Sequence, residues 1–273
     1  MENITTDFLS DIITSKLKDV RLEKKRQWIE NNKFHTNFFY VDDLLPNDIV
    51  VRIYEVLRNV KVKLWNKRKT FRESKKEFVK FEDASKIISN ITEAFHKKNI
   101  LELIESITNI SNLEADASLY AGGVSMMNNE DFLNPHIDNS HDASKKRFRR
   151  LNLLYYVSPE WVEDNGGNLE LWDKKVKRNN TVTSKFNRLV VMKTDKNSWH
   201  SVSQVKVNKP RYCVSNYYFT TNSPEKNNYY HVTSFHGRPN QKLRRFYCMI
   251  DNKIRQKIAD ITGYGRGKHL IRY

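Results

Sequence analysis

The first third of the chain carries apolar residues at helical spacing. Residues 7–31 predict one long helix, because apolar side chains recur there every three or four positions. Its expected buried positions are Phe8, Ile12, Ile13, Leu17 and Val20. A short strand is expected over residues 37–45, and Pro46 favours the start of a helix that continues toward Trp65. After a charged connection, further helix is expected over residues 84–107.

Beyond residue 117 the pattern changes to short apolar runs separated by turn residues. Strands are predicted over residues 148–157, 166–172, 187–192 and 211–219. Short strands with turn signals at this spacing are typical of a β-sandwich or barrel, so the expected fold class is α+β and mainly β. Residues 241–262 return to helical spacing ahead of a basic tail. The helices of the first third would then pack on one outer face of the β structure.

The length and composition indicate an ordinary globular chain. With 273 residues it can bury a sizeable core, and one domain with terminal additions is the simplest organisation. No apolar run approaches the length of a membrane span, and residues 1–7 lack the basic and apolar regions of a signal peptide. Cys213 and Cys248 are too few for a disulfide framework. These features predict a cytoplasmic protein without a membrane partner.

The net charge is strongly positive, since 48 basic and 32 acidic residues give +16. Such a balance attracts nucleic acid, ribosomes, anionic glycans or membrane surfaces. The chain is also rich in lysine and asparagine throughout, so a purely compositional origin of the charge stays open. Two local clusters favour a functional origin. They are residues 145–150 and the group Arg238, Lys242, Arg244 and Arg245.

One set of polar residues has the spacing of a metal site. His136 and Asp138 are two positions apart, so on an extended segment both side chains point to the same side. His200 lies far downstream of Asp138 and must come from a distant strand. Two imidazoles and one carboxylate can occupy one face of an octahedral metal and leave three positions open. That arrangement is the facial triad of non-haem Fe(II) oxygenases.

The order and spacing of the surrounding elements resemble the 2-oxoglutarate- and Fe(II)-dependent dioxygenases of the prolyl-hydroxylase type. The resemblance covers about residues 38–220. The matching elements are Leu119-Tyr120-Ala121-Gly122-Gly123, Pro135-His136-Ile137-Asp138-Asn139, Leu154-Tyr155-Tyr156-Val157, Gly166-Gly167, Asn187-Arg188-Leu189-Val190, Trp199-His200-Ser201-Val202 and Arg211-Tyr212. Together these motifs are specific for the superfamily and much less specific for a substrate.

The resemblance implies a double-stranded β-helix, or jelly-roll, core with N-terminal flanking helices and a C-terminal extension. We accordingly divide the chain into three parts. Residues 1–36 form an N-terminal helical extension, and residues 37–222 form the dioxygenase domain. Residues 223–273 form a basic C-terminal extension that is expected to pack on the same domain.

The resemblance also implies the cofactors and a pocket for the cosubstrate. Fe(II) would be held by His136, Asp138 and His200, and 2-oxoglutarate would chelate two of the open positions. The distal carboxylate of 2-oxoglutarate needs a buried cation, and a guanidinium suits it well. Arg211 follows His200 at about the distance of one hairpin, and the resemblance gives it this role. The other expected pocket residues are Tyr156, Tyr120, Asn152 and Ser215.

The implied reaction couples oxidative decarboxylation of 2-oxoglutarate to hydroxylation of an unactivated C–H bond. It consumes O2, and ascorbate is a candidate reductant. The expected substrate is a protein, hydroxylated on a prolyl side chain, with a small molecule or a sugar as the alternative. A nucleic-acid demethylase is less favoured, because the segment after Arg211 lacks the second arginine typical of such enzymes. A binding barrel without activity disagrees with the intact triad.

The basic segment 145–150 bears on the choice of partner. It leaves the metal motif along a loop and re-enters on the strand that carries Tyr156. Lys145, Lys146 and Arg147 are therefore expected at the rim of the site, where positive charge attracts an anionic or ribosome-associated protein. A solvated charge run is the alternative interpretation, and direct binding of nucleic acid stays open.

Overall fold

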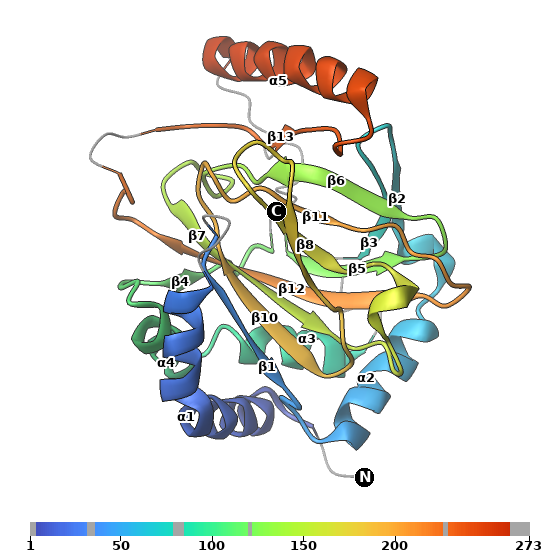
Figure 1. The fold of residues 1–273 in the computed structure, drawn as a ribbon. Helices are drawn as coiled ribbons and strands as arrows, with labels where there is room; N and C mark the ends of the chain where they lie inside the picture. The colour runs from blue at the N-terminus through green and yellow to red at the C-terminus, as the bar shows by residue number, and fades with distance from the viewer. Residues whose placement is uncertain (1–3, 32–35, 79–84, 120–121, 226–228, 263–273) are drawn as a thin grey trace.

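The molecule is built on one antiparallel β-sheet that curls on itself, with helices on two sides (Figure 1). The structure is a computed structural model that describes residues 4–31, 36–78, 85–119, 122–225 and 229–262. In this part of the chain the strands are β1 (Phe38–Asp42), β2 (Asn66–Lys69), β3 (Glu73–Phe78), β4 (Glu114–Ala115), β5 (Gly123–Met127), β6 (Phe132–Ile137), β7 (Phe148–Tyr156), β8 (Leu169–Trp172), β9 (Asn179–Val182), β10 (Arg188–Lys193), β11 (His200–Val202), β12 (Arg211–Thr220) and β13 (Ser234–Phe235).

The strand order is that of a curled jelly roll. Through the described residues it runs β1-β10-β7-β12-β5-β3-β6-β11-β8-β9, and β13, β2 and β4 join at β6, β3 and β12. The curl brings β8 and β9 over the inner face of β7, β10 and β12. There Leu171 of β8 and Val182 of β9 pack against residues of the other three strands, which are Tyr156, Val190 and Cys213. The predicted double-stranded β-helix is confirmed.

The helices lie outside the sheet. They are α1 (Thr6–Glu30), α2 (Asn47–Arg58), α3 (Lys86–Ala94), α4 (Lys98–Thr108) and α5 (Lys242–Thr262), with short 3-10 turns η1 (Val62–Leu64) and η3 (Glu163–Asn165). Figure 1 shows α1, α3 and α4 on one side of the sheet and α5 on the opposite side, next to β13. Of the helices in the described part, none has the length and apolar character needed to cross a membrane.

The central strands β7, β10 and β12 carry apolar residues on both faces because both of their faces are covered. On β7, Leu151, Leu153 and Tyr155 face the helices and join the larger core. Tyr156 points to the opposite side and joins the smaller core inside the barrel. A strand that is buried on both faces reads as a continuous apolar run instead of an alternating one. This pleating separates a structural face from an inner face on which polar groups can be displayed.

Helix α1 confirms the predicted N-terminal helix and the burial of Ile13 and Leu17, but not that of Phe8. Leu9, Ile13 and Leu17 are fully buried in the core that also contains the isoleucines of α3 and α4. Phe8, which was expected in this core, is 41% exposed. Its neighbour Leu9 lies four positions before Ile13 and so falls on the same helical stripe. The N-terminal helix therefore shares one core with the rest of the molecule.

Two helix predictions need correction. The helix that begins after Pro46 ends at Arg58 instead of continuing to Trp65, and the 3-10 turn η1 follows it. The expected helix over residues 84–107 is two helices, α3 and α4, which meet at a turn. At this turn His96 contacts Asn216 of β12 through a hydrogen bond of 3.0 Å. The break gives each short helix its own row of buried isoleucines against the sheet.

The largest departure from the sequence prediction is the hairpin of β2 and β3. A charged connection was expected there, and the core was expected to begin near residue 117. Instead β3 pairs with both β5 and β6 near the middle of the sheet. Its charged side chains compensate one another, since Glu77 lies 2.6 Å from Arg68 and 2.8 Å from Lys75. Because the strand is stabilised by ion pairs as well as by apolar packing, its sequence lacks the alternation by which strands are recognised.

Asn187 links the segment just before α2 to strand β7, and its removal should destabilise the fold. The side chain is fully buried, accepts hydrogen bonds from the Leu45 amide (3.1 Å) and the Tyr155 hydroxyl (2.8 Å), and donates to the Leu45 carbonyl (2.7 Å). Asn187→Ala leaves these buried groups unsatisfied, so we expect a loss of about 3 kcal/mol in the free energy of unfolding. Urea denaturation measures this loss. Asn66→Ala, at an exposed asparagine of β2, should change stability by less than about 0.5 kcal/mol, and equal effects would contradict the assignment.

Candidate metal centre and cosubstrate pocket

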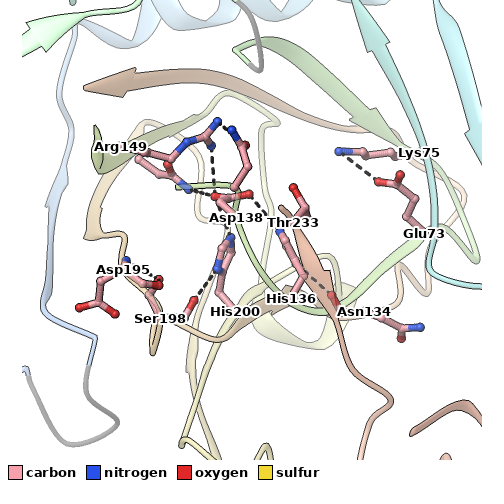
Figure 2. Close-up of polar contacts among 12 residues, drawn as sticks. Glu73, Lys75, Asn134, His136, Asp138, Arg149, Asp195, Ser198, His200 and Thr233 are labelled. Carbon is pink, nitrogen blue, oxygen red and sulfur yellow. Dashed lines mark hydrogen bonds and ion pairs between the residues drawn. The ribbon is translucent and has the colours of Figure 1, made fainter. Parts of the chain in front are cut away.

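The antiparallel pairing of β6 with β11 brings the three proposed metal ligands together. His200, the first residue of β11, lies directly opposite His136 of β6, and Asp138 follows immediately after the end of β6. Each of the three residues offers one ligand atom, and these atoms lie within 4.8 Å of one another. Figure 2 shows both imidazoles directed toward the Asp138 carboxylate. Segments far apart in sequence thus contribute to one compact cluster.

Backbone carbonyls fix the orientation and the tautomer of both imidazoles. Nδ1 of His136 lies 3.0 Å from the Asn134 carbonyl, and Nδ1 of His200 lies 2.9 Å from the Ser198 carbonyl. A carbonyl only accepts hydrogen bonds, so in each ring Nδ1 carries the proton and Nε2 keeps its lone pair. The Nε2 atoms lie 3.6 Å and 3.5 Å from the Asp138 carboxylate. Both lone pairs are therefore available to a metal ion.

Burial and charge keep the ligands in the protonation states that metal binding requires. Burial, together with the neighbouring His136, lowers the pKa of His200 to about 4, so this imidazole is neutral at physiological pH. Burial alone would raise the pKa of Asp138, but the Arg149 guanidinium and the two imidazoles hold it well below its ordinary value. Ligands that are already deprotonated need not release a proton when a metal binds.

Two side chains from β7 hold the Asp138 carboxylate in place. Asn152 donates a hydrogen bond of 2.7 Å from Nδ2 to Oδ2 of Asp138, and Arg149 forms an ion pair of 3.3 Å with the same oxygen. Asn152 was expected to line the cosubstrate pocket, and the structure places it against the carboxylate ligand. Groups that hold a metal ligand in position contribute to metal affinity and to the charge at the site.

Arg149 is a site residue that the sequence analysis did not single out. Its side chain is buried, and the guanidinium lies over the ring of Tyr217 at 4.2 Å. Strict alternation from Asn152 would turn Arg149 away from the inner face. However, β7 pairs Leu151 with Tyr218 and Arg149 with Phe219, so one residue between them is left without a partner. This bulge turns Arg149 inward, and the sequence shows only a run of basic residues there.

The C-terminal segment supports the other side of the metal cluster. Strand β13 pairs with the end of β6, and the ring of Phe235 stacks on His136 with centroids 5.3 Å apart and an interplanar angle of 21°. Helix α5 holds this strand, because Asn252 donates to the Phe235 carbonyl (2.7 Å) and accepts from its amide (2.9 Å). Arg255 adds a hydrogen bond of 2.7 Å to the Thr233 carbonyl.

The donor set fits Fe(II). It offers two imidazole nitrogens and one ionised carboxylate within 4.8 Å of one another. Imidazole and carboxylate together are the ligands of non-haem Fe(II), and this combination leaves coordination positions for a cosubstrate and oxygen. His141, His231 and His236 are not members of the cluster that the described residues form.

Arg211 is a buried cation on the inner face of the barrel. It is 3% exposed, its Nε donates to the Ser184 hydroxyl (3.2 Å), and its guanidinium lies over the ring of Tyr156 at 4.8 Å. Among the described residues no carboxylate lies within ion-pair distance of it. Burying a guanidinium without a counter-ion is costly, so this position favours the binding of an anion. This is the environment expected for the distal carboxylate of 2-oxoglutarate.

The remaining side chains between Arg211 and the metal ligands also fit a polar ligand. Burial raises the pKa of Tyr156 to about 12, so its hydroxyl stays protonated. This hydroxyl lies near Arg211 and Ser184, yet within the described residues it makes no well-formed hydrogen bond, and the same holds for Oδ1 of Asn152. A carboxylate bound at Arg211 could accept a hydrogen bond from the Tyr156 hydroxyl.

Two predicted pocket residues need separate comment. Ser215 lies on β12 between Arg211 and Tyr217, with its hydroxyl 3.6 Å from the Cys213 sulfur. It therefore shares the inner face with Arg211, because residues four apart on a strand point to the same side. Tyr120 lies outside the described residues.

Gly167 allows Arg211 to approach the turn that precedes β8. A Cβ atom at this position would lie 2.8 Å from Cδ of Arg211, and the backbone has a φ of +64°, which favours glycine. The Gly166-Gly167 pair is one of the elements that carry the family resemblance. The structure shows that its second glycine also makes room for the buried guanidinium.

The basic segment 145–150 is divided between different roles. Arg147 is half-buried and engaged in ion pairs with Asp142 (2.9 Å) and Glu114 (3.2 Å). Its charge is therefore compensated within the fold, contrary to the expectation of a free positive rim. Lys145 and Lys146 are exposed. Any attraction of this segment for an anionic partner rests on these two lysines.

Comparison with known proteins agrees with this geometry. A sequence profile described as the 2OG-Fe(II) oxygenase superfamily matches residues 122–219. This stretch contains the three proposed metal ligands and Arg211. No curated protein matches the chain.

Solved structures of oxygenases share the fold. A prolyl hydroxylase from Trichoplax adhaerens, in complex with a peptide of the hypoxia-inducible factor, superposes with a TM-score of 0.55 at 16% identity over 75% of this chain and 92% of that one. A prolyl-4-hydroxylase from Pseudomonas putida gives a TM-score of 0.52 at 14% identity, covering 76% and 98% of the two chains. HygX from Streptomyces hygroscopicus, with nickel and 2-oxoglutarate bound, gives 0.51 at 12% identity, covering 72% and 87%.

Metal binding should depend on the histidines of the cluster. Manganese(II), a stand-in for Fe(II) that resists oxidation, should bind at one site in calorimetry. His136→Ala and His200→Ala should each weaken this binding by more than about 100-fold, because even groups that only hold a ligand in place contribute about 10–100-fold. His141→Ala, at an equally buried histidine outside the cluster, should bind normally. Undiminished manganese binding in both variants would show that His136 and His200 are not metal ligands.

Cosubstrate binding should depend on Arg211. Removing one partner of a buried ion pair costs on the order of 3–5 kcal/mol, so Arg211→Ala should raise the KM for 2-oxoglutarate by more than about 100-fold. Manganese binding should be retained. Arg188→Ala, which removes the ion pair with Asp42 at the outer end of β10, should leave this KM unchanged. The rate of succinate formation at increasing 2-oxoglutarate concentration gives the KM of both variants. A wild-type KM in Arg211→Ala would place the pocket elsewhere.

Proposed function

We propose that this 2-oxoglutarate- and Fe(II)-dependent dioxygenase hydroxylates a prolyl side chain of a protein. The enzyme class follows from the superfamily match, the jelly-roll fold and the three-residue ligand cluster. The choice of a prolyl substrate is our inference. It is supported by the shared fold of two prolyl hydroxylases, one of them bound to a peptide.

The observation that carries the proposal is an aromatic side chain, Tyr217, beside the proposed metal ligands. Tyr217 lies half-buried on the inner face of β12, and its pKa is raised by burial and by the nearby Asp138 carboxylate. The Arg149 guanidinium lies over its ring and bridges to Asp138. A saturated five-membered ring packs well on an aromatic face. On the face of Tyr217 that Arg149 leaves uncovered, such a ring would lie near the carboxylate that would hold the metal.

The residues of the site have separate tasks in this reaction. Bound Fe(II) would supply the oxygen chemistry that hydroxylates an unactivated C–H bond while 2-oxoglutarate is converted to succinate and carbon dioxide. Arg211 and Tyr156 would orient the cosubstrate through its distal carboxylate. Asn152 and Arg149 keep Asp138 ionised and in position. The apolar cluster of Tyr156, Leu171 and Cys213 excludes water from the floor of the pocket.

A small molecule is the second candidate substrate. HygX, which has the same fold, was solved with nickel and 2-oxoglutarate. The alpha-ketoglutarate-dependent epimerase SnoN from nogalamycin biosynthesis also shares the fold, with a TM-score of 0.52, so the fold is not confined to prolyl hydroxylases. The half-buried Tyr217 favours the prolyl side chain over a sugar, because a sugar would need more hydrogen-bonding partners than this side chain offers.

The partner is proposed to be a cytoplasmic protein. An anionic or ribosome-associated protein would be attracted by the net charge of +16 and by exposed Lys145 and Lys146. With Arg147 paired inside the fold, this attraction is weaker than the sequence indicates. Direct binding of nucleic acid has no support from the site and is not part of the proposal.

A peptide experiment tests the proposed substrate. Proline-containing peptides, arrayed over varied flanking sequences, are incubated with the iron-loaded enzyme and 2-oxoglutarate. We expect some peptides to stimulate succinate formation and to gain the mass of one oxygen atom, and their Pro→Ala counterparts to do neither. Tyr217→Ala should raise the KM for such a peptide by about tenfold, the loss expected for one aromatic contact, and Tyr217→Phe should restore it.

Uncoupled turnover of 2-oxoglutarate serves as the control. It should change much less than the peptide KM in Tyr217→Ala, because Arg211 and the metal ligands are untouched. If every proline peptide fails while an aminoglycoside or another small molecule stimulates turnover, the prolyl proposal is wrong and the second candidate is correct. Oxygenation of a peptide at a residue other than proline would also reject it.

A further inference from the structure

Helix α5 is oriented with its polar face toward the protein. Asn252, Arg255 and Gln256 form hydrogen bonds to the backbone of the segment that includes β13, and Asp251 forms an ion pair of 3.0 Å with Arg72. Of the residues of α5, just Cys248 and Ala259 are buried. A surface helix normally buries its apolar face and exposes its polar face, so this helix is reversed.

The face of α5 that points away from the protein is apolar. We call it the apolar stripe, and its members are Leu243, Phe246, Tyr247, Ile250, Ile254, Ile258 and Ile261, which are 41–77% exposed. At 3.6 residues per turn these side chains fall within an arc of about 120°. Figure 1 shows α5 as the outermost element on its side of the molecule. Among the described residues, no other helix or strand lies beyond α5 on this side (Figure 1), and the side chains of the stripe are exposed.

The spacing of the stripe fits a flat surface better than a second helix. Leu243 and Ile261 are separated by about five full turns of a straight helix, so they lie on one line parallel to its axis. A coiled-coil seam instead follows a repeat of 3.5 residues. That repeat would place the exposed Lys257 in the seam between Ile254 and Ile261. A broad stripe parallel to the axis is the form of a helix that lies in the plane of a membrane surface.

The charges beside the stripe select an anionic surface. Lys242 and Lys253 are exposed along one border of the stripe, and the exposed Lys257 lies just inside that border. Asp260, on the same border, is the one exposed acidic residue of α5. A second copy of α5 would carry the same positive charge, so pairing of two α5 helices would bring like charges together. The net charge of +16 on each chain adds to this repulsion. An anionic lipid surface would attract the same groups.

We propose that α5 docks on anionic phospholipid bilayers through the apolar stripe, with the bordering lysines at the level of the headgroups. The occupant is the lipid surface itself, which the helix contacts without crossing it. The polar face keeps its hydrogen bonds to the segment of β13 during docking. The docked enzyme would thus keep its active site intact while it is concentrated where a membrane-associated substrate lies. The proposal is independent of the identity of the hydroxylated residue.

Vesicle flotation with the full-length, metal-loaded protein tests the proposal. Phosphatidylcholine vesicles with phosphatidylserine should carry the protein to the top of the gradient, and vesicles of phosphatidylcholine alone should carry about tenfold less. Ile250→Glu with Ile254→Glu should abolish flotation. The matched control is Leu22→Glu with Ile29→Glu, because these residues are 70% and 64% exposed on α1, and it should float normally. Manganese binding verifies that each variant is folded.

A charge variant separates the contribution of the lysines to membrane binding from that of the apolar stripe. Lys253→Gln with Lys257→Gln should weaken flotation and reduce its dependence on salt, while the apolar stripe stays unchanged. No binding to phosphatidylserine vesicles, or equal loss in the α1 and α5 variants, would overturn the proposal. Sedimentation that shows a dimer, lost in the Ile250→Glu, Ile254→Glu protein, together with no vesicle binding, would instead identify a second copy as the occupant. None of these results affects the proposed hydroxylation.

Discussion

The pairing of His136 with His200 across β6 and β11 is the contact on which the active site depends. Two ligands that are far apart in sequence become cross-strand neighbours, and Asp138 follows at the end of the same strand as His136. A shift of this pairing by one residue would turn one imidazole to the other face of the sheet. The hydrogen bonds from Nδ1 of both rings to backbone carbonyls add a second constraint, because they hold the rings as well as the strands.

Two buried arginines lie on the inner face, and they differ in whether their charge is paired. Arg149 is paired with Asp138, so its charge is used within the fold to keep a metal ligand ionised. Arg211 has only neutral neighbours at hydrogen-bonding distance in the described part of the chain, a hydroxyl and a thioether. The difference in partners explains why one guanidinium supports the metal centre while the other is suited to an incoming carboxylate. Both lie on neighbouring strands, β7 and β12, which pair in the middle of the sheet.

The C-terminal segment links the edge of the metal site to the surface of the molecule. Phe235 stacks on His136, β13 carries Phe235, and Asn252 of α5 holds the backbone of Phe235 from both sides. These contacts occupy the polar face of α5 and leave its apolar face open. The reversed orientation of the helix is therefore a consequence of its role in supporting β13. The contacts from His136 through Phe235 to Asn252 thus connect the metal site to the helix that exposes the apolar stripe.

From the sequence by itself, periodicity predicted the terminal helices and a β-sandwich or barrel, because helical spacing and pleating are local. The resemblance of its motifs predicted the jelly-roll core, the proposed ligand set and the role of Arg211. The tertiary structure alone decided which polar residues face inward. Arg149 enters the site through a bulge, β3 enters the sheet through ion pairs such as that of Lys75 with Glu77, and Phe235 reaches His136 from the far end of the chain. Each of these depends on a pairing between distant segments, which local patterns do not encode.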